Sequence, residues 1–344
     1  MIKRIQGFTL LALALFATPA AAQESIAQFY KGKTLSMLVG APPGGGYDLY
    51  GRMVARHMSK HLPGAPAFVA TNMVGAGGNL MVEYVNGVAA KDGTVIGTVA
   101  PGTMLEPLLG DKTKVKFDPA KLNYIGSANK EIYVCFVRAD APAKSFADAM
   151  TQEVILGATA EGGTTRDLPI LLNNVLGTKF RVVSGYPGTR NIVMAIEKGE
   201  VQGQCGTGWS SITTLHPDWF RNGAARVLAI EGANTAPDLE AMKTPFTTDF
   251  AKTPEQKQIL DLVYSQATFG RPFLVAPEVP AERVEALRAA FDKTMVDPEF
   301  LAEAKKIGLD IRPLSGAEVQ ALVTKTYATP PDVIEKARKA MAAR

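Results

Sequence analysis

Short apolar runs alternate with longer amphipathic stretches along most of the chain. The runs 34–40, 67–72 and 94–100 have the pattern of strands, and the stretches 48–61 and 79–89 between them have the periodicity of helices. Strands that alternate with helices form parallel sheets whose faces are covered by helices. The first third of the chain therefore predicts an α/β unit.

A second series of the same kind begins near Tyr124. Its predicted strands are 133–138, 154–158, 180–184, 201–205 and 226–230, and its predicted helices are 166–176 and 191–198. Apolar strands that end at Ala-Pro and lead into a helix occur twice, at 135–142 and at 273–277. This repetition predicts two α/β lobes, with the chain crossing between them on paired long strands.

We place the two crossings near 126–132 and 266–272. Lobe 1 would then comprise 23–127 and 267–344, and lobe 2 would comprise 128–266. Lobe 1 includes the predicted C-terminal helices, at 281–295, 299–307, 317–327 and 332–342. No low-complexity tract or polar linker separates the lobes, so we expect a compact hinge.

The N-terminus has the order of an export signal. Lys3 and Arg4 precede a nine-residue apolar core, 8–16, and small residues then lead to Ala22. A membrane span needs about 20 apolar residues, and a buried helix gives no reason for this order. We expect 1–22 to be a signal peptide that is cleaved after Ala22, leaving a periplasmic protein.

Charge and side-chain chemistry exclude several classes of function. Removal of 1–22 leaves 35 Lys and Arg against 33 Asp and Glu, a net charge of +2, which predicts no nucleic-acid partner. His57 and His61 are spaced for a shared metal, but without a further ligand nearby they read as a solvated helix face. No G-x-S-x-G turn is present, and Ser210, Ser211 and His216 have no partners that complete a catalytic triad. We therefore expect neither an enzyme nor a metal or cofactor site.

Glycine-rich turns recur where predicted strands meet predicted helices, which is the usual ligand crevice of an α/β sheet. In lobe 1 the candidate ligand-binding residues are Gly44, Gly45, Gly46, Tyr47, Asp48 and Thr103. Glycines let the backbone approach a ligand, and free N–H groups at a helix start attract anions. Asp48 also suits helix capping, and the turn 75–79 suits a structural role. No Lys-Ser/Thr pair follows the first turn, which disfavours a nucleotide phosphate.

Lobe 2 offers a matching set of turns. Its candidate ligand-binding residues are Gly163, Thr164, Thr165, Arg166, Tyr186, Thr189, Arg190 and Thr207. Thr164 and Thr165 suit either helix capping or donation to a ligand. Arg166 and Arg190 oppose the helix dipole, so each either faces solvent, pairs with a nearby acid or contacts a ligand carboxylate. Arg271 is a weaker candidate of the same kind. Together these turns predict a shared anion-binding cleft.

Several of these motifs resemble a known family. The stretches that carry the likeness are Tyr30-Lys31-Gly32-Lys33, Pro42-Pro43-Gly44-Gly45-Gly46-Tyr47-Asp48, Gly75-Ala76-Gly77-Gly78-Asn79 and Asp92-Gly93-Thr94. Phe117-Asp118-Pro119, Glu197-Lys198-Gly199-Glu200-Val201 and the segment 277–280 continue it. In this order they resemble the Bug-type extracytoplasmic receptors of tripartite tricarboxylate transporters.

The resemblance implies a type II periplasmic-binding-protein fold, in which two α/β lobes joined by a two-strand hinge close like a Venus flytrap. It implies that the loops starting at Gly44 and Gly163 grip the carboxylate of a small organic acid, a mono- or dicarboxylate, without catalysis. It also implies a monomer that works with integral membrane transporter subunits. In this fold the strands carrying Cys135 and Cys205 lie side by side, so we expect these two cysteines, the only two in the chain, to form a disulfide.

The sequence also departs from the family pattern. Tyr47 stands where the family usually has threonine, and Cys205-Gly206-Thr207 lacks the aspartate that binds an amino group in many relatives. The latter argues against an amino-acid ligand. Because Arg166 and Arg190 are unusual for the family, we expect a second ligand carboxylate to be contacted directly. Two alternatives remain: a receptor that signals to a membrane sensor, which genome neighbourhood would distinguish, and an enzyme built on this scaffold.

Overall fold

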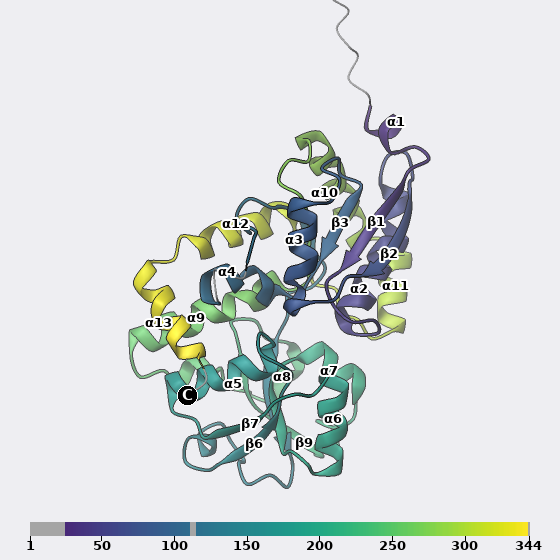
Figure 1. Cartoon of the computed structure of the whole chain (residues 1–344). Coiled ribbons are helices and arrows are strands. Elements are labelled where there is room, and N and C mark those ends of the chain that lie inside the picture. The colour runs from purple at the N-terminus through teal and green to yellow at the C-terminus, as the bar shows by residue number, and fades with distance from the viewer. Residues whose placement is uncertain (1–24, 111–114, 343–344) are drawn as a thin grey trace, which may run out of the picture.

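The structure is a computed structural model, and it describes residues 25–110 and 115–342. Two α/β lobes are visible, each built on its own sheet (Figure 1). The expected signal peptide lies outside the described residues. None of the helices within the described ranges combines the length and apolar character needed to cross a membrane.

Lobe 1 contains a six-stranded sheet. Its strands are β1 (Thr34–Val39), β2 (Ala67–Asn72), β3 (Val95–Thr98), β4 (Asn123–Ser127), β10 (Pro272–Val275) and β11 (Leu314–Ser315). They lie in the order β11-β4-β10-β3-β1-β2. β1 is parallel to both β2 and β3, while β10 runs antiparallel between β3 and β4. The return strand β10 thus brings the later part of the chain into the first sheet.

Helices and short 3-10 turns surround this sheet. They are α1 (Ile26–Tyr30), α2 (Gly46–Met58), η1 (Ser59–His61), η2 (Ala76–Gly78), α3 (Asn79–Gly87), η3 (Pro101–Met104), α4 (Glu106–Leu109), α10 (Ala281–Met295), α11 (Pro298–Lys306) and α12 (Gly316–Tyr327). The side chains of α2 that are fully buried, such as Tyr50 and Met53, form part of the main hydrophobic core. Burial of this apolar stripe stabilises α2 and fixes where its first residue lies.

Lobe 2 contains a five-stranded sheet in the order β7-β6-β8-β5-β9. The strands are β5 (Tyr133–Arg138), β6 (Val154–Gly157), β7 (Phe180–Val183), β8 (Gly203–Gly208) and β9 (Ala225–Glu231). Its helices are η5 (Asp148–Met150), α5 (Thr164–Leu176), α6 (Thr189–Lys198), α7 (Trp209–Leu215), α8 (Pro237–Ala241), η6 (Thr247–Phe250) and α9 (Pro254–Phe269). β5 is antiparallel to β8 and β9, and the sheet carries apolar clusters on both faces.

The chain passes from the first sheet to the second between Ser127 and Tyr133, and it returns between Phe269 and Pro272. The return differs from the paired long strands expected from the sequence, because helix α9 leads into it. The segment has a helical pattern: a capping box at Thr253, then proline, then buried residues at helical spacing. Its buried face stabilises a helix that runs up to the crossing, where the sequence had suggested a long strand.

The two crossing segments are bonded to each other. The N–H of Ala128 donates to the carbonyl of Arg271 (3.2 Å), and the N–H of Glu131 donates to the carbonyl of Ala267 (2.9 Å). Between them Gly270 has φ +62°, and a Cβ there would lie 1.6 Å from the carbonyl oxygen of Asn129. Only glycine fits this crossing.

The last helix, α13 (Pro331–Met341), lies across both lobes (Figure 1). The sequence assigned this segment to lobe 1, but α13 packs against α5 and α9 as well as against α4. Asn174 of α5 donates to the carbonyls of Ala340 and Ala342, and Arg338 donates to the carbonyl of Leu108. The C-terminus therefore ties the lobes together outside the hinge.

Cys135 and Cys205 are joined by a disulfide between neighbouring strands β5 and β8, which is the pairing that the resemblance implied. Both residues are fully buried. The bond closes a segment with a sequence separation of 70. It fixes β8 directly before Gly206, at the end of the strand where the candidate ligand-binding loops lie.

Candidate ligand-binding cleft

The first loop of lobe 1 leads from β1 into α2, with Gly45 as the helix N-cap. Asp48, expected as a cap or a ligand contact, instead stands inside the helix and is buried. Its carboxylate accepts from the N–H of Gly44 (2.9 Å), from Arg52 (2.8 Å) and from Asn72 (2.8 Å). Burial opposes its ionisation, but these hydrogen bonds outweigh burial and hold the pKa of Asp48 below its ordinary value. Asp48 thus shapes the loop from within.

The other two turns of lobe 1 pack against each other. The hydroxyl of Thr103 is buried and donates to the carbonyl of Gly77 (3.0 Å). A Cβ on Gly78 would lie 3.0 Å from that hydroxyl and 3.3 Å from the carbonyl oxygen of Gly40. The side chain of Thr103 therefore joins two loops, and its contact with a ligand stays a prediction.

In lobe 2 the loop before α5 is held by threonine hydroxyls. Thr164 donates to the carbonyl of Gly206 (2.7 Å), and the Thr165 hydroxyl accepts from the N–H of Thr159 (3.0 Å). Gly163 is the N-cap, without a side-chain cap. Of the two roles that the sequence left open for these threonines, neither is seen: they join the loop to its neighbours and leave the first N–H groups of α5 uncapped.

The arginines expected at the cleft lie in different surroundings. Arg166 donates to Asp167 (2.7 Å) and lies 4.0 Å from Glu161, so it is paired with acids of its own chain. Arg190 is exposed at the second position of α6, directly after Thr189.

The other candidates of lobe 2 lie near the same edge of the sheet. Tyr186 is partly buried, and its ring lies 3.5 Å from where a Cβ on Gly157 would stand. The hydroxyl of Thr207 is buried and has no hydrogen-bond partner among the described residues. A buried hydroxyl without a partner costs free energy, so Thr207 is available to a ligand or a water molecule.

A buried ion pair lies at the hinge. Arg271 of the second crossing donates to Glu131 of the first (2.8 Å), and each side chain is only 4% exposed. The guanidinium carbon lies 4.6 Å from the ring centroid of Tyr47 and 4.4 Å from that of Tyr50. The phenol of Tyr133 lies beside that of Tyr47, and burial raises the pKa of both. Tyr47 therefore covers the ion pair.

Glu231 is a second buried acid in this region. It ends β9, is fully buried, and accepts the N–H of Gly206 through Oε2 (2.5 Å), while its Oε1 has no partner among the described residues. Burial raises its pKa from 4.5 to about 8. Gly206 has φ +65°, and a Cβ there would lie 2.1 Å from the Thr164 carbonyl oxygen. A chain of contacts thus runs from Glu231 through Gly206 to the first turn of α5.

Sequence reasoning missed Glu131, Tyr133 and Glu231. Tyr133 begins β5, Glu231 ends β9, and Glu131 lies two residues before β5. A polar residue at or near the end of a buried strand is too common a pattern to single out. The available signal was an acid next to an isoleucine, which occurs at Glu131-Ile132 and at Ile230-Glu231.

The two lobes touch on both sides of the hinge. A Cβ on Gly102 would lie 3.9 Å from the carbonyl oxygen of Gly162. On another side Thr214 donates to the carbonyl of Gly308 (2.7 Å), and Arg312 donates to the carbonyl of Thr235 (3.3 Å). The loops of both lobes are therefore close enough to contact one small molecule.

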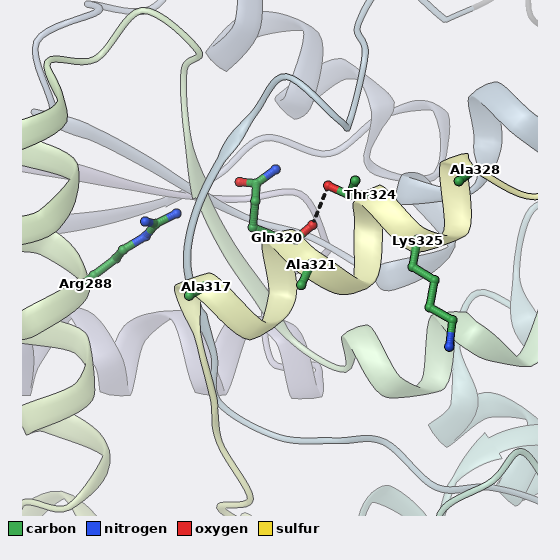
Figure 2. A pocket seen from close by; sticks show the side chains of 7 residues that line it. All are labelled: Arg288, Ala317, Gln320, Ala321, Thr324, Lys325 and Ala328. Carbon is green, nitrogen blue, oxygen red and sulfur yellow. Dashed lines mark hydrogen bonds between the residues drawn. The ribbon is translucent and has the colours of Figure 1, made fainter.

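Two features of lobe 1 lie apart from these loops. His57 and His61, expected on a solvated face, contact Glu303 (2.7 Å) and Asp297 (2.8 Å) and so hold α2 to α11. A surface hollow lies over α12 and α10 (Figure 2), lined by Arg288, Ala317, Gln320, Ala321, Thr324, Lys325 and Ala328. None of the candidate loops lies next to α10 or α12 in the chain, so the hollow is not part of the candidate cleft.

The fold is shared with solved periplasmic binding proteins. MatC from Rhodopseudomonas palustris, solved with malate, aligns with a TM-score of 0.65 and 18% identity, over 90% of this chain and 99% of its own. The periplasmic binding protein BugD gives 0.67 and 19%, over 90% and 98%. An R. palustris protein solved with adipate gives 0.66 and 20%, over 90% and 97%. These similarities identify the type II periplasmic-binding-protein fold.

Comparison with curated proteins gave no match. The family model described as "Tripartite tricarboxylate transporter family receptor" matches residues 50–339, which include every candidate loop except the turn 44–48. The chain belongs to the family of tripartite tricarboxylate transporter receptors.

Proposed function

We propose that this protein is a periplasmic solute-binding protein that captures a small organic carboxylate between its lobes and delivers it to the membrane subunits of a tripartite tricarboxylate transporter. Family membership supports a role in binding a transported solute. Two proteins of the same fold were solved with malate and with adipate, which supports a carboxylate as the ligand class.

One observation supports the carboxylate most directly. Three helices that follow strands, α2, α5 and α6, each begin after a glycine N-cap without a side-chain cap. Their first N–H groups are therefore left for another acceptor. An anion is favoured there by both the free donors and the helix dipole. These three helix starts come from both lobes, so a ligand carboxylate would join them.

Closure of the two lobes makes the hydrogen bonds to the carboxylate favourable. A carboxylate on one open lobe exchanges hydrogen bonds with water for hydrogen bonds with protein, which gains little. When the second lobe excludes that water, charge-assisted hydrogen bonds contribute about 1.5–3 kcal/mol each. The closeness of Gly102 to Gly162, whose carbonyl oxygen would lie 3.9 Å from a Cβ on Gly102, supports such a closed arrangement.

Calorimetric titration with a panel of mono- and dicarboxylates tests the proposal. Thr165→Val removes the hydroxyl that holds the loop before α5, so we expect at least about tenfold weaker binding, or about 1.4 kcal/mol, with the fold retained. The matched control is Thr324→Val, an exposed threonine of α12 whose hydroxyl bonds only within its own helix; it should bind like the wild type. Ligands without a carboxylate that bind as tightly as the acids would contradict the proposal.

A further inference from the structure

The cations around the cleft are almost all neutralised by acids of the chain itself. Each pair has an N–O distance of 2.6–2.8 Å: Arg52 with Asp48, Arg166 with Asp167, Arg271 with Glu131 and Arg312 with Asp310. Such a pair offers a ligand carboxylate little net attraction, because the internal acid repels it. Arg190, exposed at the start of α6, is the cation of these loops for which the structure shows no such partner among the described residues.

The pair at the hinge is the most strongly held. Arg271 and Glu131 are both buried, and they join the two segments on which the chain crosses between lobes. Separating a buried pair leaves an uncompensated charge in a medium of low polarity. A second carboxylate of a ligand would have to displace Glu131 or lie beside it, and both are unfavourable. The hinge end of the cleft therefore does not suit a second negative charge.

The side chains around the Arg271–Glu131 pair suit an uncharged end of the ligand. The rings of Tyr47 and Tyr50 cover the Arg271 guanidinium, and a Cβ on Gly46 would lie 3.0 Å from its Nη1. Tyr133, from lobe 2, lies beside Tyr47, and its hydroxyl is buried without a well-formed hydrogen bond. An aromatic face and an unpartnered hydroxyl can receive a ring, an alkyl chain or a hydroxyl group.

We propose that the ligand is a monocarboxylate whose uncharged end packs against Tyr47 and Tyr133 at the hinge, and that Glu131 excludes dicarboxylates by neutralising Arg271. The inference rests on the proposed function, since it assumes that the cleft binds an acid. It sets this chain apart from the proteins solved with malate and adipate, which are both dicarboxylates.

Calorimetry with matched acids tests the inference. The probes are benzoate with terephthalate and hexanoate with adipate, so each pair differs by one carboxylate on a similar skeleton. In the wild type we expect the monoacid of a pair to bind at least about tenfold tighter than the diacid. In Glu131→Gln the charge of Arg271 is free, so the ratio should move at least about tenfold toward the diacid. General damage to the fold weakens both acids and does not move the ratio in this direction.

Two further variants distinguish an effect of the Arg271 charge from general damage to the fold. Glu131→Gln alone leaves a buried charge and can destabilise the protein, whereas Glu131→Gln with Arg271→Gln removes both charges and should restore the preference for the monoacid. Glu303→Gln changes an acid that pairs with Arg56 and His57 away from the cleft, and it should leave the ratio unchanged. Dependence of diacid binding on Arg190, shown by its loss in Arg190→Gln, would instead place a second carboxylate at the rim.

The outcomes separate the two proposals. A wild type that prefers the diacid of a pair, or a ratio that Glu131→Gln does not move, overturns this inference alone. A wild type that binds none of the four acids, and that releases no organic acid when freshly purified protein is denatured, overturns the proposed function and this inference together.

Discussion

Replacing Glu231 with glutamine should change how the stability of the protein depends on pH. Burial raises the pKa of this carboxyl from 4.5 to about 8. Between these values the folded protein holds a proton that the unfolded chain has released, so the free energy of unfolding falls as pH rises. One such group contributes about 1.4 kcal/mol per pH unit. Over about three pH units, from pH 5 to pH 8, the loss is at most about 4 kcal/mol.

Urea denaturation at intervals between pH 5 and pH 8 measures this loss. The glutamine side chain cannot ionise and keeps an oxygen that accepts the Gly206 N–H, so the variant should gain stability relative to the wild type as pH rises. Glu318→Gln is the control: hydrogen bonds from the backbone N–H and the hydroxyl of Ser315 outweigh burial and lower the pKa of Glu318, so this residue stays ionised throughout the range. Curves for wild type and Glu231→Gln that remain parallel would refute the assignment of a protonated Glu231.

Three further predictions concern other parts of the chain. Oxidised, denatured protein should show no free thiol, because Cys135 and Cys205 are paired; reduction should cost about 4 kcal/mol in the chain-entropy model, and two titratable thiols before reduction would contradict the pairing. Gly270→Ala should lower the melting temperature markedly, because the new Cβ meets the carbonyl of Asn129; an unchanged melting temperature would show that the crossing relaxes freely. N-terminal sequencing of periplasmic protein should begin at Gln23, and an intact Met1 there would contradict export.

Helices and strands whose own sequence has a clear hydrophobic pattern were predicted well. The strands 67–72 and 133–138 have the bounds expected from their sequence. β8 is displaced, because Gly203–Gly208 consists of glycine and polar residues around one cysteine and has no apolar pattern. It forms a strand because β5 and β6 flank it and supply its hydrogen bonds. The conformation of β8 therefore depends on β5 and β6, and the periodicity of the β8 sequence does not identify these neighbouring strands.

The candidate loops were located from sequence, but the roles of several side chains within them were not. Glycine before a helix identifies a turn, so the starts of α2, α5 and α6 lie at predicted glycine-rich turns. Thr103, Thr164 and Asp48 were expected to meet a ligand or to cap a helix, yet each bonds another loop or its own loop.

The charge pairing at the hinge was beyond sequence reasoning. Arg271 and Glu131 are 140 residues apart, and they meet only because the two crossings lie side by side. A sequence pattern shows which residues carry charge but not which distant residue neutralises them. For that reason the sequence left open whether an acid or a ligand pairs with these arginines, and the structure shows Arg166 and Arg271 paired with acids.

Small-angle scattering tests the central claim, closure of two lobes on a carboxylate, most directly. The radius of gyration should fall when the protein is saturated with an acid that calorimetry shows to bind, because closure of two lobes around a ligand makes the molecule more compact. It should not fall with the corresponding amide, which lacks the charge. Scattering curves that superpose with and without a saturating acid would contradict the account.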